Sequence, residues 1–386
     1  MNWLALKMLT GDRSKYLGLI FGVTFAALLM SQQLSIFVGI MKRTGSQILD
    51  VRDADIWVMD NKVRFIDEVP GLPDTELQRV QGVPGVAWAV RMYKGQVRAR
   101  MPDGNFRSVI LFGLDDATLV GAPQEMLAGN VGDLRNPDAV IVDKAGYEYL
   151  WPDDVAAIKT EGYKLGKVFE MNDHRCVLVG VCKVSPPFTT LPVLYTAYSQ
   201  TTWYVPRERD TMSFVLVKPE PGLDPREVCR RIEQQTGRMA LTQDQFFWKT
   251  IVYFMTSTGI PVNFGITIFL GFFVGVAIAG QTFYLFTVEN LRHFGSLKAM
   301  GLSNVRVVGM ILLQALIVGA IGYALGVGLT SLYFLATNQR TQLAGLNMPW
   351  EVMAGTGAAV LLIVVLASLV SIRKVVILEP AVVFRG

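Results

Sequence analysis

Histidine is nearly absent from this 386-residue chain, which has only His174 and His293. The layout predicted below puts them on opposite sides of a membrane, so neither a histidine metal cluster nor a triad with two histidines can form. The acid pairs Asp115-Asp116 and Asp153-Asp154 are more typical of solvated loops than of a general acid and base. The chain also lacks the G-x-x-x-x-G-K-S/T loop that cradles nucleotide phosphates. We therefore expect no catalytic residues, no metal site and no ATP hydrolysis by this chain.

Cysteine is scarce as well, with Cys176, Cys182 and Cys229 alone. The first two lie in a segment, HRCVLVGVCKV, that alternates like a strand and would hold their Cα atoms about 20 Å apart. A disulfide needs a separation of about 4.4 to 6.8 Å, so these two cannot pair unless the chain folds back between them. The odd total leaves at least one thiol free or bonded to another chain. We expect all three to be packing residues.

Charge is also limited, at 18% of the chain, whereas 51% of the residues are hydrophobic and the mean hydropathy is +0.37. This composition is too apolar for an ordinary soluble protein. Four charge-free runs carry the excess, at residues 16–41, 250–288, 307–339 and 352–372. Each is longer than the roughly 20 residues that cross a bilayer, whereas helices of a soluble core would be shorter and broken by polar faces. The sequence predicts four transmembrane α-helices.

Most of the charge lies between the first two runs, in residues 42–249, which contain 26 of the 36 Lys and Arg and 28 of the 32 Asp and Glu. Strand-like alternation occurs there in segments 53–59, 86–115 and 167–184, the last two with turns at Pro102-Asp103-Gly104 and Asn172-Asp173. Residues 213–237 then pass from strand to helix, with Asp224 as the N-cap and Pro225 in the first turn. The fold class is thus a membrane protein with a large α+β extracytoplasmic domain inserted between helices 1 and 2.

The charges near the spans predict the orientation, because Lys and Arg there are retained in the cytoplasm. The N-terminal flank, the loop after the second run and the C-terminal tail each carry a net charge of +2, whereas the short loop near Arg340 is neutral and the large domain carries −2. Lys42 and Arg43 oppose this orientation, but long domains translocate largely regardless of such charges. Both termini are therefore predicted to be cytoplasmic, in a multi-pass protein of the bacterial inner membrane.

The predicted layout in chain order is an interfacial helix at 1–15, transmembrane helix 1 at 16–41, the periplasmic domain at 42–249, transmembrane helix 2 with its outer lead-in at 250–288, a cytoplasmic helix at 289–304, transmembrane helix 3 at 305–337, a short outer loop at 338–350, transmembrane helix 4 at 351–372 and a cytoplasmic tail at 373–386. A frayed extension of the first span is the alternative for residues 1–15.

The first span is interrupted by four polar residues, Ser31, Gln32, Gln33 and Ser35. Amides and hydroxyls at membrane depth need partners, so we expect these to face another helix, a second subunit or a wet pathway. Helix-to-helix contact is favoured over contact with a substrate. Small residues spaced four apart also allow close helix packing, at Gly18 and Gly22, Gly271 and Gly275, and Gly322 and Gly326. Packing within one chain and dimerisation both remain open.

Residues 289–303, ENLRHFGSLKAMGLS, lie between two spans and predict a short amphipathic helix. Apolar residues recur every three positions, at Leu291, Phe294, Leu297 and Met300. Gly301 suits the C-terminal end, and Ser303 or Asn304 can start the next helix. A simple charged connector is the alternative, but a connector needs neither the stripe nor the caps. An apolar face beside water meets lipid headgroups or a protein.

This segment resembles the E-x-x-R-E-I/F-G-x-x-K/R-A-x-G signature of ABC-transporter permeases of the macrolide-exporter and cell-division type (MacB, FtsX and the DevC-like exporters). The matching residues are Glu289, Arg292, Phe294, Gly295, Leu297, Lys298, Ala299, Met300 and Gly301. The end of the chain resembles the D-P-x-x-A-L-R tail of the same group, through Glu379, Pro380 and Arg385. The layout of spans matches as well. Two residues depart from the pattern, since His293 stands where an acid is usual and Glu379 replaces Asp.

The resemblance implies that 289–304 is a coupling helix seated in a cleft of a separate ATPase subunit. Leu291, Phe294, Leu297 and Met300 would then be buried anchors, and Arg292, His293 and Lys298 would make polar contacts. It also implies two permease copies, two ATPase subunits that bind ATP and Mg, a periplasmic adaptor, an outer-membrane channel and no nucleic acid. This chain would bind no cofactor.

The implied function is export of a hydrophobic or amphipathic substrate by mechanotransmission, in which ATPase motion passes through rigid spans to the periplasmic domain. The segment VILFGLDDATLVGAP favours the DevC-like exporters by resemblance. One alternative is an FtsX-like signalling permease that activates a cell-wall hydrolase. Another is a membrane-anchored enzyme or sensor without an ATPase.

Overall fold

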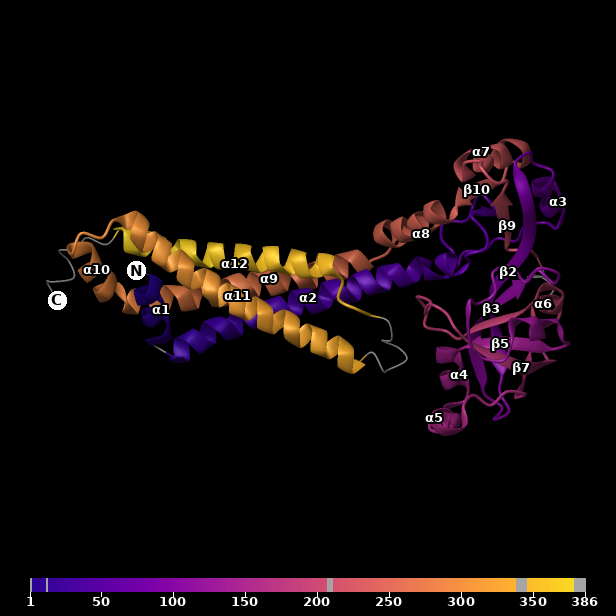
Figure 1. Ribbon diagram of the computed structural model, residues 1–386, viewed down its shortest axis with the longest axis horizontal. Helices are drawn as coiled ribbons and strands as arrows, with labels where there is room; N and C mark the ends of the chain where they lie inside the picture. Colours follow the sequence, from indigo (N-terminus) through magenta and orange to yellow (C-terminus); the bar gives the residue numbers. More distant parts are fainter. Residues whose placement is uncertain (1, 12, 207–210, 338–345, 378–386) are drawn as a thin grey trace. The chain divides into compact units, whose positions relative to one another are not determined.

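The computed structural model describes residues 2–11, 13–206, 211–337 and 346–377, and the chain forms two compact units (Figure 1). The helical unit comprises residues 1–39 and 259–386, and the sheet unit comprises residues 40–258. The tail residues Glu379, Pro380 and Arg385, and most of the predicted loop 338–350, lie outside the described residues.

The described part of the helical unit is built from α1 (Asn2–Gly11), α2 (Arg13–Asp50), α9 (Ile260–Glu289), α10 (Leu291–Ala299), α11 (Asn304–Thr337) and α12 (Trp350–Ile377). Helices α2, α9, α11 and α12 are each long and apolar enough to cross a membrane, which confirms the four predicted transmembrane helices. The last part of α2, from Ile40 onward, belongs to the sheet unit. One helix thus contributes to both units.

Two boundaries differ from the predicted layout. The predicted interfacial segment 1–15 contains α1, but α2 already begins at Arg13. The predicted span 250–288 is divided between α8 (Gln243–Ser257) and α9. Thr258 is extended at φ −121° and ψ 157°, which ends α8, and Pro261 lies in the first turn of α9. The apolar run continues across this break, so hydropathy alone does not reveal it.

The sheet unit contains one ten-stranded sheet with the order β10-β1-β9-β2-β3-β8-β5-β7-β4, and β6 pairs with β2 and β7. The strands are β1 (Ile56–Met59), β2 (Val86–Arg100), β3 (Phe106–Leu114), β4 (Glu125–Ala128), β5 (Ala139–Asp143), β6 (Val168–Met171), β7 (His174–Lys183), β8 (Val193–Ala197), β9 (Phe214–Pro219) and β10 (Met239–Thr242). The helices of this unit include α3 (Thr75–Gln81), α4 (Lys144–Leu150), α5 (Ile158–Glu161), α6 (Tyr198–Tyr204), α7 (Pro225–Thr236) and α8. The predicted α+β domain between the first two spans is confirmed.

The predicted local signals appear in this unit. Antiparallel pairs join β2 to β3 and β6 to β7, across the turns that the sequence predicted. Gly104 adopts φ +81° in the first of these turns, a conformation that glycine allows. Helix α7 begins with the predicted N-cap, because the Asp224 carboxylate accepts a hydrogen bond from the Arg226 N–H at 3.0 Å.

The central strands are buried on both faces. Successive side chains of a strand point to opposite faces of the sheet, and in these strands both sets are apolar. Along β9, Val215 and Val217 pack into one core cluster and Phe214 and Leu216 into the other. On the second face the Trp57 ring meets Phe214 at 5.2 Å and Phe246 of α8 at 5.6 Å, so α8 covers part of this core. The sheet therefore packs against a hydrophobic core on each face, unlike an antiparallel sheet with one buried and one solvent-exposed face.

The three cysteines are buried and unbridged, as expected for Cys176 and Cys182. Burial raises the pKa of Cys176 and Cys229 to about 12, and it also raises the pKa of Cys182. A thiol that is hard to ionise is a poor nucleophile, so all three behave as packing residues.

Candidate functional site

The short helix α10 ends in a glycine motif that fixes the direction of the chain into α11. Gly301 adopts φ +89°, its N–H donates to the Lys298 carbonyl at 3.0 Å, and the Leu302 N–H donates to the Leu297 carbonyl at 3.1 Å. This pair of bonds is a Schellman motif, in which a residue with a Cβ would be strained at the glycine position. The positive φ of Gly301 thus explains why a glycine stands at the C-terminal end of α10, where the sequence analysis predicted it.

One face of α10 packs against the chain itself. The Phe294 side chain is fully buried in a cluster with Val307 and Ile311 of α11 and Val375 of α12. Leu291 is partly buried against the same cluster. Burying a phenylalanine this completely stabilises the contact by a few kcal/mol, since removal of such a ring costs about 3–5 kcal/mol. Helix α10 is therefore fastened to the ends of α11 and α12.

Lys298 adds a polar attachment at the same place. Its ammonium donates to the carbonyl oxygens of Val375 at 2.7 Å and Val376 at 3.1 Å, in the last turn of α12. A cation there satisfies orphan carbonyls and is favoured by the helix dipole. Burial lowers the pKa of Lys298. Lys298 therefore makes contacts within the chain, and its predicted contact with a partner stays a prediction.

The start of α10 is held by two further polar contacts. The Glu289 carboxylate forms an ion pair with Lys15 near the start of α2. The Asn290 side-chain amide donates to the Phe286 carbonyl at 2.9 Å, across the corner between α9 and α10. Exposed ion pairs contribute little stability, so we regard the first contact as an orienting one.

The other face of α10 is exposed, at Arg292, His293, Ser296, Ala299 and Met300. The Met300 side chain is 75% exposed. Val305, in the first turn of α11, is 81% exposed and was missed by the sequence analysis. Its only sequence signal is an apolar residue between Asn304 and Arg306. We define the α10 surface as Arg292, His293, Ser296, Met300 and Val305.

This distribution corrects one expectation. Phe294 was predicted to be an anchor for a partner, but its ring is fully buried against the chain's own helices. Leu291 and Leu297 are half-buried. Only Met300 of the predicted apolar stripe presents most of its surface outward. The apolar stripe of α10 thus serves mainly to attach this helix to its own unit.

One of the polar residues in the first span, Ser31, contacts α11 through its hydroxyl. Ser31 is fully buried, and its hydroxyl lies 2.7 Å from the Thr330 hydroxyl. The Ser35 hydroxyl is buried and has no hydrogen-bond partner among the described residues. Gln32 and Gln33 are half-buried. A contact that the sequence analysis missed joins Gln314 to α1, whose Ala5 carbonyl accepts from the Gln314 amide at 2.7 Å.

Five of the six predicted packing glycines lie in close helix contacts within the chain. A Cβ at Gly326 would lie 2.6 Å from the Ala27 Cβ and 2.8 Å from the Thr24 carbonyl oxygen, and one at Gly322 would lie 2.7 Å from a Val23 methyl. The other contacts join Gly22 to Ile278, Gly271 to Leu29, and Gly275 to Ala26 and Ile363. Gly18 is the exception, since a Cβ there would meet nothing within 4 Å.

Among the described residues, no group of three or more His, Cys, Asp or Glu side chains could hold a metal ion. The two histidines belong to different units, with His174 exposed in β7 and His293 exposed in α10. The α10 surface offers cationic, hydroxyl and apolar groups.

Comparison with known proteins identifies both parts of the chain. A family model described as FtsX-like permease C-terminal matches residues 265–380, and one described as MacB-like periplasmic core domain matches residues 16–235. The uncharacterized ABC transporter permease Rv0072 of Mycobacterium tuberculosis is 26% identical over 381 residues, covering 96% of this chain and 93% of the relative. The uncharacterized ABC transporter permease Rv2563 of the same organism is 24% identical over 237 residues, covering 61% and 62%.

Among solved structures, the periplasmic region of MacB from Actinobacillus actinomycetemcomitans matches 55% of this chain and 96% of its own length, with 13% identity and a TM-score of 0.38. The extracellular domain of the transporter YknZ from Gram-positive bacteria matches 49% and 98%, with 16% identity and a TM-score of 0.35. The periplasmic-core family model covers more than half of the chain, and the permease model covers the region from α9 to α12. The chain therefore belongs to the ABC transporter permeases of the MacB/FtsX type, multi-pass membrane proteins that imply an ATPase partner.

Proposed function

We propose that this chain is the membrane subunit of an ATP-driven exporter and that the α10 surface binds the ATPase. The observation that carries this proposal is the two-sided character of α10. Phe294 and Lys298 fasten one side to α11 and α12, whereas Arg292, His293 and Met300 leave the other side open to a partner. A partner that moves α10 must therefore also move the ends of two spans.

The contacts continue from α11 to α2. Gly322 and Gly326 bring α11 against the backbone of α2 near Thr24, and the Ser31–Thr330 hydrogen bond lies one turn further along. Helix α2 then continues without a break to Asp50, in the sheet unit. There the Asp50 carboxylate accepts hydrogen bonds from Ser185, from its N–H at 3.0 Å and its hydroxyl at 2.8 Å. Mechanotransmission requires packed elements that move together, and the contacts described within each unit support this role.

The proposed complex has two copies of this permease and two ATPase subunits that hold ATP and Mg. It lies in the bacterial inner membrane with both termini in the cytoplasm, and it works with a periplasmic adaptor and an outer-membrane channel. The substrate is hydrophobic or amphipathic, and the DevC-like exporters are the proposed subgroup. A coupling role for α10 is supported by its sequence resemblance and by its exposed surface.

The test uses surface residues rather than Phe294, because a charge at Phe294 would disrupt the chain's own packing. We expect Met300→Asp combined with Val305→Asp to abolish recovery of the ATPase when the tagged permease is purified from membranes. The matched control, Met300→Leu with Val305→Ile, keeps both side chains apolar and should retain the complex. Unchanged recovery of the ATPase with the aspartate variant would contradict the coupling assignment.

Export itself requires a second readout. The purified complex in liposomes should hydrolyse ATP faster when the adaptor and a transported amphiphile are present. If purification of the complex instead recovers a cell-wall hydrolase bound to the sheet unit and no adaptor, this result would contradict export and favour the signalling alternative.

A further inference from the structure

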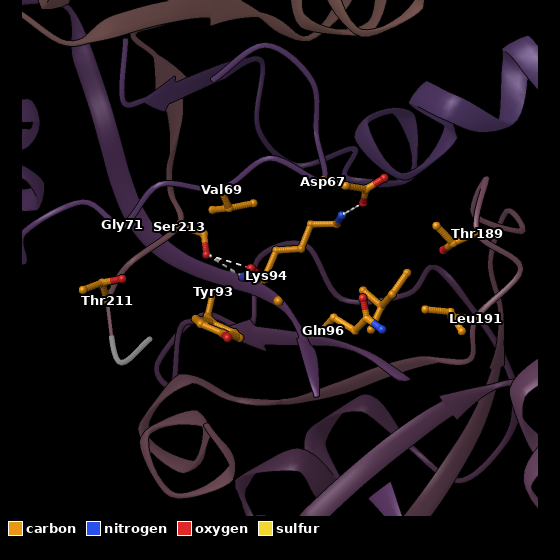
Figure 2. Close-up of a pocket in the computed structure, with 12 residues that line it drawn as sticks. Asp67, Val69, Gly71, Tyr93, Lys94, Gln96, Thr189, Leu191, Thr211 and Ser213 are labelled. Atoms are coloured by element: carbon orange, nitrogen blue, oxygen red, sulfur yellow. Dashed lines mark hydrogen bonds and ion pairs between the residues drawn. The ribbon is translucent and has the colours of Figure 1, made fainter. Parts of the chain in front are cut away.

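A pocket of about 360 Å³ lies in the sheet unit (Figure 2). It is lined by residues of β2 and β3 and of three connecting segments, 67–71 after β1, 189–191 before β8 and 211–213 before β9. Its floor contains Tyr93, Lys94 and Ser213, whose side chains are almost entirely buried. Its volume is at the small end of the range for small-molecule sites, which is about 300–1,000 Å³. Nothing in the proposed coupling path uses this pocket.

The pocket forms where β2 exchanges one neighbouring strand for another. Strand β9 pairs with β2 as far as Met92, and β6 pairs with it from Ala99 onward. Between them the Ser213 hydroxyl accepts from the Lys94 N–H at 2.8 Å and donates to the Lys94 carbonyl at 3.1 Å. Ser213 thus replaces the ladder bonds that a strand would make, and the sheet edge opens beside it.

A balanced ion pair forms one wall of this pocket. Figure 2 shows the Lys94 side chain extended toward the Asp67 carboxylate, and the two form an ion pair. The Lys94 side chain is 3% exposed, and that of Asp67 is 29% exposed. Burial lowers the pKa of Lys94, whereas the Asp67 carboxylate opposes this shift. One positive and one negative charge leave the wall neutral overall, so it favours neither anions nor cations.

The rest of the lining combines hydrogen-bonding groups with apolar surface. Thr189 and Thr211 are exposed residues of the rim that carry hydroxyls, and Gln96 adds an amide. Leu191 and Ile110 supply apolar contact. Hydroxyls donate and accept, an amide does both, and the carboxylate only accepts. Such a mixture matches a ligand whose own groups can also donate and accept.

Two wall positions are glycines that let neighbouring side chains approach. A Cβ at Gly71 would collide with the Thr211 side chain, and a Cβ at Gly95 would collide with the Tyr93 ring. The bridge between Leu72 and Met212, with an N–H to carbonyl distance of 2.7 Å, holds the first of these pairs together. The shape of the wall therefore depends on the absence of side chains at these positions.

We propose that this pocket binds an uncharged polyhydroxylated ring, a sugar, either free or as the headgroup of a lipid. The hydroxyls of such a ring match the Asp67, Gln96 and threonine groups, and its C–H faces match Tyr93, Leu191 and Ile110. This inference does not rest on the exporter proposal, because binding is measured without ATP or the ATPase.

The experiment uses the full chain in nanodiscs prepared without alkyl-glycoside detergents, whose sugar headgroups would compete. The probes are the methyl pyranosides of glucose, galactose and mannose, with glucosamine and glucuronate as charged analogues. Saturation-transfer NMR detects binding, and titration gives the affinity. We expect at least one methyl pyranoside to bind, and both charged analogues to bind at least fivefold more weakly. No saturation transfer to any methyl pyranoside, or tighter binding of a charged analogue, would overturn the proposal.

Variants locate the binding in the pocket. Thr189→Val with Thr211→Val keeps the shape of the rim and removes two hydroxyls, and we expect at least tenfold weaker binding. Thr160→Val, at an exposed threonine of α5 outside this pocket, is the matched control and should bind as the unmodified chain does. Equal binding by the rim variant and the control would place the sugar elsewhere and refute the assignment. Nanodiscs with and without a glucosyl diacylglycerol distinguish a free sugar from a lipid headgroup as the natural ligand. If the lipid headgroup reaches the pocket, the glycolipid displaces the free pyranoside, and if it does not, binding of the pyranoside is the same in both preparations.

Discussion

The close contact between α11 and α2 leads to a quantitative prediction for Gly326→Ala. The added methyl group would lie 2.6 Å from the Ala27 Cβ, 2.8 Å from the Thr24 carbonyl oxygen and 2.9 Å from the Leu28 backbone nitrogen. Two of these three atoms belong to the backbone, so no side-chain rotation can relieve the overlap. The two helices must separate instead.

Separation has a cost that can be estimated. Overpacking of this kind costs about 1–3 kcal/mol, and we take the upper end because backbone atoms are involved. The higher helix propensity of alanine returns about 1 kcal/mol. Stretching the Ser31–Thr330 hydrogen bond adds about 0.6 kcal/mol, the average for such bonds in membrane proteins. We expect Gly326→Ala to lower the unfolding free energy by about 2–3 kcal/mol.

The matched control is Gly328→Ala, two residues further along α11, where a Cβ would meet nothing within 4 Å. This variant should be as stable as the unmodified chain or up to about 1 kcal/mol more stable. The assay is reversible unfolding by SDS in mixed micelles, followed by tryptophan fluorescence. Equal stability of the two alanine variants would refute the packing described for α11 and α2.

Three further predictions concern buried groups. Phe294→Ala should lower the unfolding free energy by about 3 kcal/mol in the same SDS assay, whereas Met300→Ala, at an exposed side chain, should change it by less than about 0.5 kcal/mol. Asp67→Ala leaves the buried Lys94 ammonium without its counter-ion and should lower the unfolding free energy, measured by thermal unfolding, by about 3 kcal/mol. The double variant Asp67→Ala with Lys94→Met removes the buried charge as well and should regain most of this free energy. Burial raises the pKa of Asp143 from 3.8 to about 6, so the folded chain binds more protons than the unfolded chain between these values. The unfolding free energy should therefore fall by up to about 3 kcal/mol as the pH rises from about 4 to 6, and Asp143→Asn should remove this dependence.

The four spans and the hairpins were predictable because their signals are local. A charge-free run of more than 20 residues or a turn such as Pro102-Asp103-Gly104 needs no knowledge of the fold. The break between α8 and α9 also had a local signal, in Gly259 and Pro261, but the continuous apolar run hid it. Hydropathy records how apolar a segment is and not where its helix ends.

The candidate site was only partly predictable. Periodicity identified the helix 289–303 and its glycine, but it could not say what covers the apolar stripe. The structure buries Phe294 against Val307, Ile311 and Val375, which are 13 to 81 positions away in the sequence. In the same way, Gly18 and Gly22 belong to the same pair of small residues four positions apart. A Cβ at Gly22 would nevertheless contact Ile278 of α9, whereas a Cβ at Gly18 would meet nothing within 4 Å. Contacts between distant segments decide these outcomes, and a single sequence does not contain them directly.

The sugar pocket illustrates the same limit in the sheet unit. Lys94 and Gln96 read as polar positions of an ordinary strand. Their environment arises because β9 leaves β2 after Met92 and β6 joins it only at Ala99. This exchange of strands is a property of the whole sheet.

The most direct test of the central claim is the accessibility of a thiol placed on the α10 surface. All three native cysteines are buried, so Met300→Cys provides an accessible thiol in the helical unit. We predict that a membrane-impermeant maleimide labels Cys introduced at this position only from the cytoplasmic side, in inverted membrane vesicles, and that bound ATPase protects it. Labelling from outside intact cells, or equal labelling with and without the ATPase, would contradict the account.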